Sequence, residues 1–167
     1  MNRPVRKSPR LNGYDYSSCG AYFLTICSNK FKQLFGSIQL GLRENTMILS
    51  EIGMIVQNKL ELLPGRFPEF ETLNYVVMPN HVHLLILKSD SGTAYDRSIP
   101  DFVCAFKSLA TQEIRRKYPS KPVWKESFHD HIIRNERDLK THWDYIDQNV
   151  NRWQKDKYFF QRTNHRD

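Results

Sequence analysis

The chain has 167 residues, of which 40% are hydrophobic and 26% are charged. This length suits one domain with a real core, and the composition excludes a low-complexity chain. Lysine and arginine exceed aspartate and glutamate by 25 − 18 = 7, an excess that favours an anionic partner such as a nucleic acid. No apolar run is long enough to cross a bilayer, so we expect no membrane partner.

The three cysteines, Cys19, Cys27 and Cys104, lack C-x-x-C spacing, which is typical of reduced thiols in a cytosolic protein. The N-terminus is polar and lacks the apolar stretch of a signal peptide. We therefore expect a cytoplasmic protein that is nucleoid-associated when it is bound to DNA.

Residues 1–12 combine two prolines and no acidic residue with four basic side chains: Arg3, Arg6, Lys7 and Arg10. Such a segment is either a solvated tail or a flexible arm that grips phosphate. We expect this arm to precede a single domain over residues 13–167.

The first regular element is a strand over "AYFLTICS" (21–28), which is rich in β-branched and aromatic residues. Residues 30–49 predict short strands around a turn. Ser50 then caps a helix over 51–63, which Pro64 and the following glycine end. Apolar residues recur along this helix at helical spacing: Ile52, Ile55, Val56, Leu60 and Leu63.

Two strands, "FETLNYVVM" (70–78) and "HVHLLILK" (81–88), are joined tightly at Pro79-Asn80. The remaining elements are a loop over 91–98, a helix over 101–118 with Pro100 in its first turn, a strand over 127–134, and a last helix over 136–153 capped by Asn135. The order β, α, β-β, α, β, α predicts an α+β fold. We expect a central antiparallel sheet with flanking helices, close to the ferredoxin-like pattern.

Two histidines interrupt the apolar stretch "VVMPNHVHLLIL". Because alternate side chains of a strand share a face, His81 and His83 point the same way with their Cα atoms roughly 6–7 Å apart. They are close enough to share one cation. The alternative is a pair of core histidines that backbone carbonyls satisfy.

The last helix carries a tyrosine beside its apolar stripe. With about 100° per residue, Trp143, Ile146 and Val150 fall within about 40° of Leu139 and predict the buried face. Tyr145 and Asn149 are neighbours one turn apart, on the shoulder of that stripe. Tyr145 is either an edge tyrosine with a solvated hydroxyl or a residue with a chemical role.

Together, His81, His83 and the carboxamide oxygen of Asn149 predict a three-ligand site with open positions, which suits Mg²⁺ or Mn²⁺. A phenol one turn away is a nucleophile candidate towards a metal-bound phosphate. Attack by Tyr145 would retain the energy of the phosphodiester as a covalent phosphotyrosine. That chemistry fits strand transfer better than degradation.

Three blocks resemble one family. "MPNHVH" resembles the His-hydrophobic-His motif of HUH endonucleases. The stretch "VWKESFHDHIIRNERDLKTHWDYIDQN" (123–149) resembles the C-terminal block of REP-associated tyrosine transposases, which are related to the single-tyrosine transposases of small insertion sequences. "GAYFLTICSNKFKQLFG" (20–36) is similar to the first strand of that family and the segment after it. The likeness covers most of residues 13–150.

The resemblance implies an RNA-recognition-like (RRM-like) HUH nuclease fold with His81 and His83 as metal ligands, Tyr145 as nucleophile and Asn149 as third ligand. Members cleave single-stranded DNA at or beside small hairpins, in repetitive extragenic palindromes or transposon ends, leaving a 5′-phosphotyrosine and a free 3′-hydroxyl. Some relatives are homodimers that exchange the tyrosine helix. Members usually have proline after the position of Asn149, where this chain has Val150.

A second histidine pair, His129 and His131 in "FHDH", has the same strand spacing and is an alternative metal pair. We expect DNA contacts from basic residues as a group: Arg3, Arg6, Lys7, Lys107, Lys125, Arg134 and Arg152. Two other functions stay open at this point. One is a ferredoxin-like nucleic-acid-binding module without chemistry, and the other is a metal-dependent phosphodiesterase that uses water.

Overall fold

The computed structural model describes residues 11–90, 92 and 96–159. The basic residues predicted to contact DNA from the N-terminal arm, Arg3, Arg6 and Lys7, lie outside this range. In chain order the elements are β1 (Gly20–Cys27), the 3₁₀ helix η1 (Asn29–Phe31), β2 (Gly36–Gln39), β3 (Thr46–Leu49), α1 (Glu51–Arg66), β4 (Phe70–Met78), β5 (His81–Lys88), α2 (Ile99–Lys117), β6 (His129–Ile132), α3 (Glu136–Gln148) and the 3₁₀ helix η2 (Trp153–Lys155).

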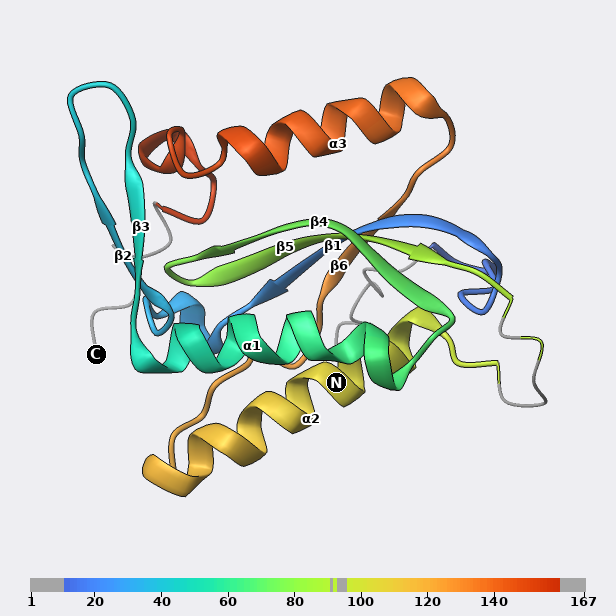
Figure 1. The fold of residues 1–167 in the computed structure, drawn as a ribbon, viewed down its shortest axis with the longest axis horizontal. Helices are drawn as coiled ribbons and strands as arrows, with labels where there is room; N and C mark the ends of the chain where they lie inside the picture. The colour runs from blue at the N-terminus through green and yellow to red at the C-terminus, as the bar shows by residue number, and fades with distance from the viewer. Residues whose placement is uncertain (1–10, 91, 93–95, 160–167) are drawn as a thin grey trace, which may run out of the picture.

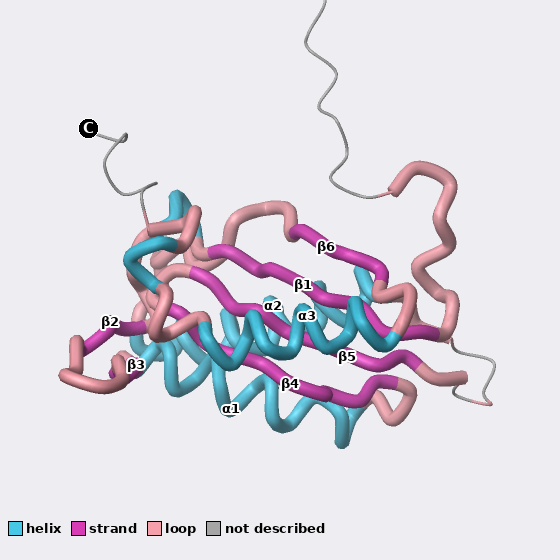
Figure 2. The backbone as a smooth tube through the Cα atoms, turned by 90° about the horizontal axis from the view of Figure 1, so that it is seen from above, coloured by secondary structure: helices cyan, strands magenta, loops and turns pink. Residues whose placement is uncertain are grey.

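Four of the strands form one antiparallel sheet in the order β4-β5-β1-β6. Helices α1 and α2 cover one face of this sheet and α3 covers the other (Figure 1). Viewed from above, α3 lies over the sheet with α1 and α2 behind it (Figure 2). This order of strands and helices confirms the predicted α+β, ferredoxin-like architecture.

Strands β2 and β3 pair only with each other and form a separate hairpin beside the sheet. The hairpin rises next to the chain that follows α3 (Figure 1). Asn45, at its turn, accepts from the N–H of Gly41 through Oδ1 over 3.3 Å, and its main-chain N–H donates to Oδ1 of Asn151 over 2.7 Å. The hairpin tip is therefore attached to the C-terminal segment.

Local hydrogen bonds explain where the helices begin. The Ser50 hydroxyl accepts from the N–H of Gly53, and the side chain of Asn135 accepts from the N–H of Asp138, as predicted for helix caps. Helix α2 begins at Ile99, earlier than predicted, because Ser98 and Asp101 form a reciprocal capping box.

Two predicted helix ends were wrong. Helix α1 continues through Pro64 to Arg66, because the N–H of Phe67 donates to the carbonyl of Leu63 and closes a further turn. Helix α3 ends at Gln148 instead of reaching residue 153. The chain turns there, and buried Trp153 packs in a second cluster at the end of the sheet.

The main core lies between the sheet and the α1–α2 layer. Alternate residues of the central strands, Leu24 and Ile26 on β1 and Val82 and Leu84 on β5, are buried in it. Side chains at the intervening positions face α3. Within the described residues, no helix is both long and apolar enough to span a membrane.

Candidate active site

His81 and His83 lie on the α3 side of β5, opposite Cys27 and Thr25 of β1. Both imidazoles are fully buried, and their Nε2 atoms are 3.0 Å apart. Two nitrogen ligands at right angles around one ion, each about 2.1 Å from it, would be separated by about the same distance. The pair therefore has the spacing of two ligands of a single cation.

Neighbouring polar groups orient both rings. The Asn80 amide donates from Nδ2 to the carbonyl oxygens of Phe31 and Tyr158, so its Oδ1 accepts from Nδ1 of His81 over 2.8 Å. Nε2 of His81 consequently carries a lone pair. The Thr25 hydroxyl lies 2.9 Å from Nδ1 of His83. When that hydroxyl accepts, Nε2 of His83 also carries a lone pair, and both lone pairs are then available to one cation.

Both histidines are neutral at physiological pH. Burial lowers the pKa of His83 to about 3, and burial together with the neighbouring His83 holds the pKa of His81 well below its usual range. Neutral imidazole is the form that binds metals. No proton has to be removed before these two nitrogens bind an ion.

Tyr145 and Asn149 both face the sheet from α3. The Tyr145 ring lies 5.1 Å from the ring of His83 and 5.9 Å from that of Phe23, while Asn149 is buried. Burial, followed by the negative charge of Asp156, raises the pKa of Tyr145 to about 12. The predicted nucleophile and metal ligands thus meet within a single chain.

The predicted buried stripe of α3 is correct for Ile146, which is buried, and for Leu139, which packs beside it, but wrong for Trp143. Trp143 is 39% exposed, and Ile146 is the fully buried apolar residue of this helix. His142 instead packs on Phe23 with ring centroids 4.6 Å apart. The sheet-facing surface of α3 also includes polar and aromatic residues because it covers a polar site, and apolar periodicity alone does not identify those residues.

Asp156 is a site residue that sequence reasoning missed. It lies after η2, is 6% exposed, and accepts hydrogen bonds through Oδ2 from the Tyr145 hydroxyl and Asn149 Nδ2, each over 3.3 Å. Its flanking residues in the sequence are Lys155 and Lys157, so the segment resembles a solvated basic stretch. Ligand atoms of His81, His83 and Asp156 all lie within 4.8 Å of one another.

Asn149, which donates to Asp156, has a side-chain oxygen that is free to accept a hydrogen bond or bind an ion. Within the part of the chain that the structure describes, its Oδ1 is buried and has no hydrogen-bond partner. Because Nδ2 is directed to Asp156, the oxygen is the atom left to bind something else. An orphaned buried oxygen beside two imidazoles and a carboxylate is a donor set that fits Mg²⁺ or Mn²⁺.

A pocket of about 490 Å³ opens at Tyr145 and is lined by Asn149, Arg152, Lys155, Asp156 and Lys157. Close by, two lysines lie over aromatic rings: Lys125 Nζ is 4.6 Å from the Phe31 ring centroid, and Lys157 Nζ is 4.8 Å from that of Tyr158. Cations and flat rings around one opening are suited to phosphates and bases of a single strand.

The second histidine pair lies apart from His81 and His83. His129 is exposed on β6, and Nε2 of His131 contacts the Asp138 carboxylate at 2.9 Å. His131 stacks on His142, with ring centroids 4.5 Å apart and planes at 23°. Nδ1 of His142 also lies 3.2 Å from the Asp138 carboxylate, and ligand atoms of His131, Asp138 and His142 lie within 4.8 Å of one another. His131 therefore groups with His142 and Asp138, a second set of side chains that could hold an ion.

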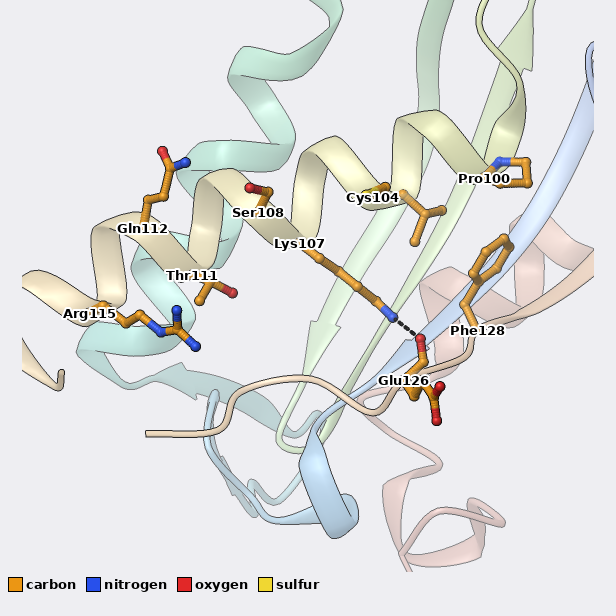
Figure 3. Close-up of a pocket in the computed structure, with 10 residues that line it drawn as sticks. Pro100, Cys104, Lys107, Ser108, Thr111, Gln112, Arg115, Glu126 and Phe128 are labelled. Atoms are coloured by element: carbon orange, nitrogen blue, oxygen red, sulfur yellow. Dashed lines mark hydrogen bonds between the residues drawn. The ribbon is translucent and has the colours of Figure 1, made fainter. Parts of the chain in front are cut away.

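Two other basic residues predicted to contact DNA lie away from Tyr145. Lys107, on α2, lines a 520 Å³ pocket on the opposite side of the sheet (Figure 3). Its Nζ donates to the carbonyl oxygens of Lys125 and Glu126 over 2.9 and 3.2 Å. Arg134 precedes α3, near the end of that helix remote from Tyr145. The DNA role of both residues stays a prediction.

Comparison with known sequences identifies the family. The profile described as "Transposase IS200 like" matches residues 65–149, which include both histidines, Tyr145 and Asn149. The chain belongs to the IS200-like transposase family. The transposase is also 31% identical over 173 residues to an uncharacterised protein of Haemophilus influenzae, covering 92% of this chain and 93% of that protein.

A second Haemophilus influenzae relative carries the name REP-associated tyrosine transposase. It is 31% identical over 139 residues, which cover 79% of this chain and 70% of that protein. The resemblance inferred from the three sequence blocks is therefore confirmed. Asp156 lies beyond the segment that the family profile matches.

Solved structures show the same fold. A REP-associated tyrosine transposase bound to a REP hairpin superposes with a TM-score of 0.58 at 20% identity, covering 88% of this chain and 74% of that one. A transposase from Deinococcus radiodurans gives a TM-score of 0.52 at 20% identity, covering 83% and 95%.

Proposed function

We propose that this transposase binds hairpin-bearing single-stranded DNA, such as a repetitive extragenic palindrome or a transposon end, and cleaves and rejoins it through Tyr145. The observation that carries the proposal is the convergence of Tyr145 with His81, His83 and Asn149 in one buried site. The name of one relative and the solved hairpin complex of another support the class of DNA.

In the cleavage step, the Tyr145 oxygen attacks the scissile phosphorus. The bond from phosphorus to the 3′-oxygen breaks, the phenol proton passes to solvent, and the departing 3′-oxygen gains a proton. The products are a 5′-phosphotyrosine and a free 3′-hydroxyl, and attack by a 3′-hydroxyl reverses the step. Because one high-energy linkage replaces another, rejoining needs no cofactor that stores energy.

His81, His83 and Asn149 would hold the divalent cation. Bound Mg²⁺ or Mn²⁺ supplies positive charge that stabilises the phosphate in the transition state and favours the phenolate of Tyr145. The pKa of Tyr145 is raised to about 12, so the phenol is protonated at neutral pH and a nearby positive charge is needed to favour the phenolate. Arg152, which lines the same pocket, is placed to bind a flanking phosphate.

The residues meet within one chain, which supports cleavage by Tyr145 at its own histidines. Helix α3 packs on β4 and β5 of the same sheet, and Tyr145 contacts His83 directly. Exchange of the helix in a homodimer is not needed to complete this site.

The proposal is tested on a denaturing gel with a labelled, hairpin-bearing single strand and Mn²⁺. We expect the wild type to form a protein–DNA adduct that Tyr145→Phe abolishes. Tyr118→Phe, at the end of α2, is the matched control and should leave the adduct unchanged. Cleavage that survives Tyr145→Phe would indicate hydrolysis by water, and binding without any cleavage would indicate a non-catalytic module.

The metal requirement is tested separately with His81→Ala. We expect cleavage to be lost while hairpin affinity stays within about threefold of wild type, because phosphate contacts elsewhere supply most of the affinity. Equal loss of cleavage, affinity and melting temperature would instead mean that His81 supports the fold.

A further inference from the structure

We propose that Asp156 supplies an anionic ligand to the divalent cation held by His81 and His83. The inference rests on the metal site of the proposed function and extends it to a residue outside the matched family segment. Asp156 lies close to both histidines. The chain after α3 returns to the sheet and places a buried carboxylate within 4.8 Å of the histidine ligand atoms.

The hydrogen bonds that Asp156 accepts come from neutral groups, and the positive charge of Lys157 acts on the neighbouring histidines without a direct ion pair to Asp156. The histidines are neutral, and Tyr145 and Asn149 are neutral hydrogen-bond donors to its carboxylate. Lys155 and Lys157 flank it in sequence but are exposed. Among the described residues, no lysine, arginine or histidine nitrogen lies within 4.0 Å of its oxygens. Buried charges are normally paired or bound to metals.

Glu69, a second buried acid among the described residues, provides a contrast. Glu69 is 2% exposed, and Oε1 accepts from Arg97 over 3.0 Å, so that carboxylate has a cation within the protein. Asp156, at 6% exposed, is also buried but has no such partner among the described residues. Its ligand oxygen lies within 4.8 Å of the histidine nitrogens, and Asn149, whose Oδ1 has no hydrogen-bond partner among the described residues, donates to it.

The segment that carries Asp156 is held in position before any ion binds. The carboxylate Oδ1 accepts from the N–H of Tyr158 over 2.7 Å, and the Tyr158 carbonyl accepts from Asn80 Nδ2 over 3.0 Å. Because Asn80 also orients His81, one buried amide fixes both the histidine and the carboxylate segment. Such outer hydrogen bonds are typical of metal sites.

The donor chemistry favours a hard divalent ion. Two imidazoles and a carboxamide form a neutral set, and the carboxylate of Asp156 makes it anionic. Added negative charge and an oxygen donor strengthen binding of Mg²⁺ and Mn²⁺. The effect of Asp156 should therefore appear in metal affinity itself, without DNA or turnover.

The test is a calorimetric titration of the full chain with Mn²⁺ in the absence of DNA. We expect Asp156→Asn to weaken Mn²⁺ binding at least about tenfold. Asp144→Asn, which removes an acid paired with Lys140 on the exposed side of α3, should stay within about twofold of wild type. An unchanged affinity in Asp156→Asn, with binding lost in His83→Ala, would overturn the inference.

Two further measurements distinguish a failure of the inference about Asp156 from a failure of the proposed metal site. Tyr145→Phe should bind Mn²⁺ like wild type while forming no adduct, and a wild type that binds no Mn²⁺ would overturn the metal site of the proposed function. If Asp156→Asn does not fold, infrared spectra of the wild type decide the question. Mg²⁺ should shift a carboxylate stretching band in wild type and not in His81→Ala, and no shift would overturn the inference.

Discussion

The two faces of the sheet show how one strand can serve two purposes. On β5, Val82 and Leu84 enter the large apolar core under α1 and α2, while His81 and His83 point towards α3. Residues one position apart therefore differ completely in environment. The α1–α2 side contains most of the apolar core that stabilises the fold. The α3 side buries fewer apolar residues because polar residues of the candidate site lie there.

The difference extends to the helices. Helix α2 buries six residues against the sheet and α1, whereas α3 buries Ile146. The rest of the α3 contact is made by partly buried and polar side chains, among them Tyr145 and His142. Helix α3 buries fewer apolar residues because its sheet-facing surface includes residues of the candidate site.

The largest expected effect compares Leu84 with its neighbour Leu85, since both are fully buried but on opposite faces. Leu84→Ala should lower the free energy of unfolding by about 3–5 kcal/mol, because it leaves a cavity in the main core. Leu85→Ala, in the small cluster with Phe23 and Ile146, should cost about 1–3 kcal/mol. Urea denaturation measures both, and equal losses would contradict the division between the faces.

The next prediction concerns pH and the histidine pair without metal. Unfolded histidine titrates near 6.5, whereas the folded pKa is about 3 for His83 and well below 6.5 for His81. Below pH 6.5 the unfolded state therefore binds protons that the folded state does not, and stability falls as pH falls. Between pH 7 and 5.5 we expect a loss of about 2–3 kcal/mol.

Urea midpoints measured across this range check the effect. The range from pH 7 to 5.5 lies above the pKa values of ordinary carboxylates, so protonation of the histidines accounts for most of the change in stability. His83→Gln should remove about half of the pH dependence, and the exposed His129→Gln should leave most of it. A midpoint that does not change between pH 7 and 5.5 would contradict neutral burial of the pair.

Much of the fold was predictable from the sequence because local patterns determine it. Periodicity located β1, β4, β5 and the two core helices, and Ser50 and Asn135 marked helix starts correctly. The helix ends were less predictable. Pro64 fits within the last turn of α1, and α3 ends where the tertiary packing of Trp153 redirects the chain.

The sequence predicted those residues of the candidate site whose type and spacing are typical of metal ligands or nucleophiles. His81, His83, Tyr145 and Asn149 were identified from spacing and family resemblance, and the structure brings them together. Asp156 was not, because no local pattern distinguishes a carboxylate that returns to the sheet from one in a solvated lysine-rich segment. Its role depends on tertiary packing through Asn80 and Tyr158.

A smaller effect tests which face binds DNA. Arg152 lines the pocket at Tyr145, whereas Lys107 lines the pocket on the α2 side. Arg152→Ala should weaken single-strand binding about threefold to tenfold and reduce the salt slope by about 0.7, the value for one phosphate contact. Lys107→Ala should change affinity less than about twofold. Fluorescence anisotropy at several salt concentrations measures both, and the reverse order would place the DNA on the α2 face.

The smallest expected effect concerns the attachment of the β2–β3 hairpin to the segment that carries Asp156. Asn45 Nδ2 donates to the carbonyl oxygens of Val150 and Asn151 over 3.4 and 3.3 Å, at an exposed position where such bonds are weak. Asn45→Ala should therefore lower global stability by no more than about 1 kcal/mol. Hydrogen exchange should still become faster in residues 150–158, because the segment loses the two hydrogen bonds from the Asn45 side chain, while exchange in β5 stays unchanged. Uniform acceleration across the sheet would mean that the hairpin stabilises the whole fold and not the α3 side alone.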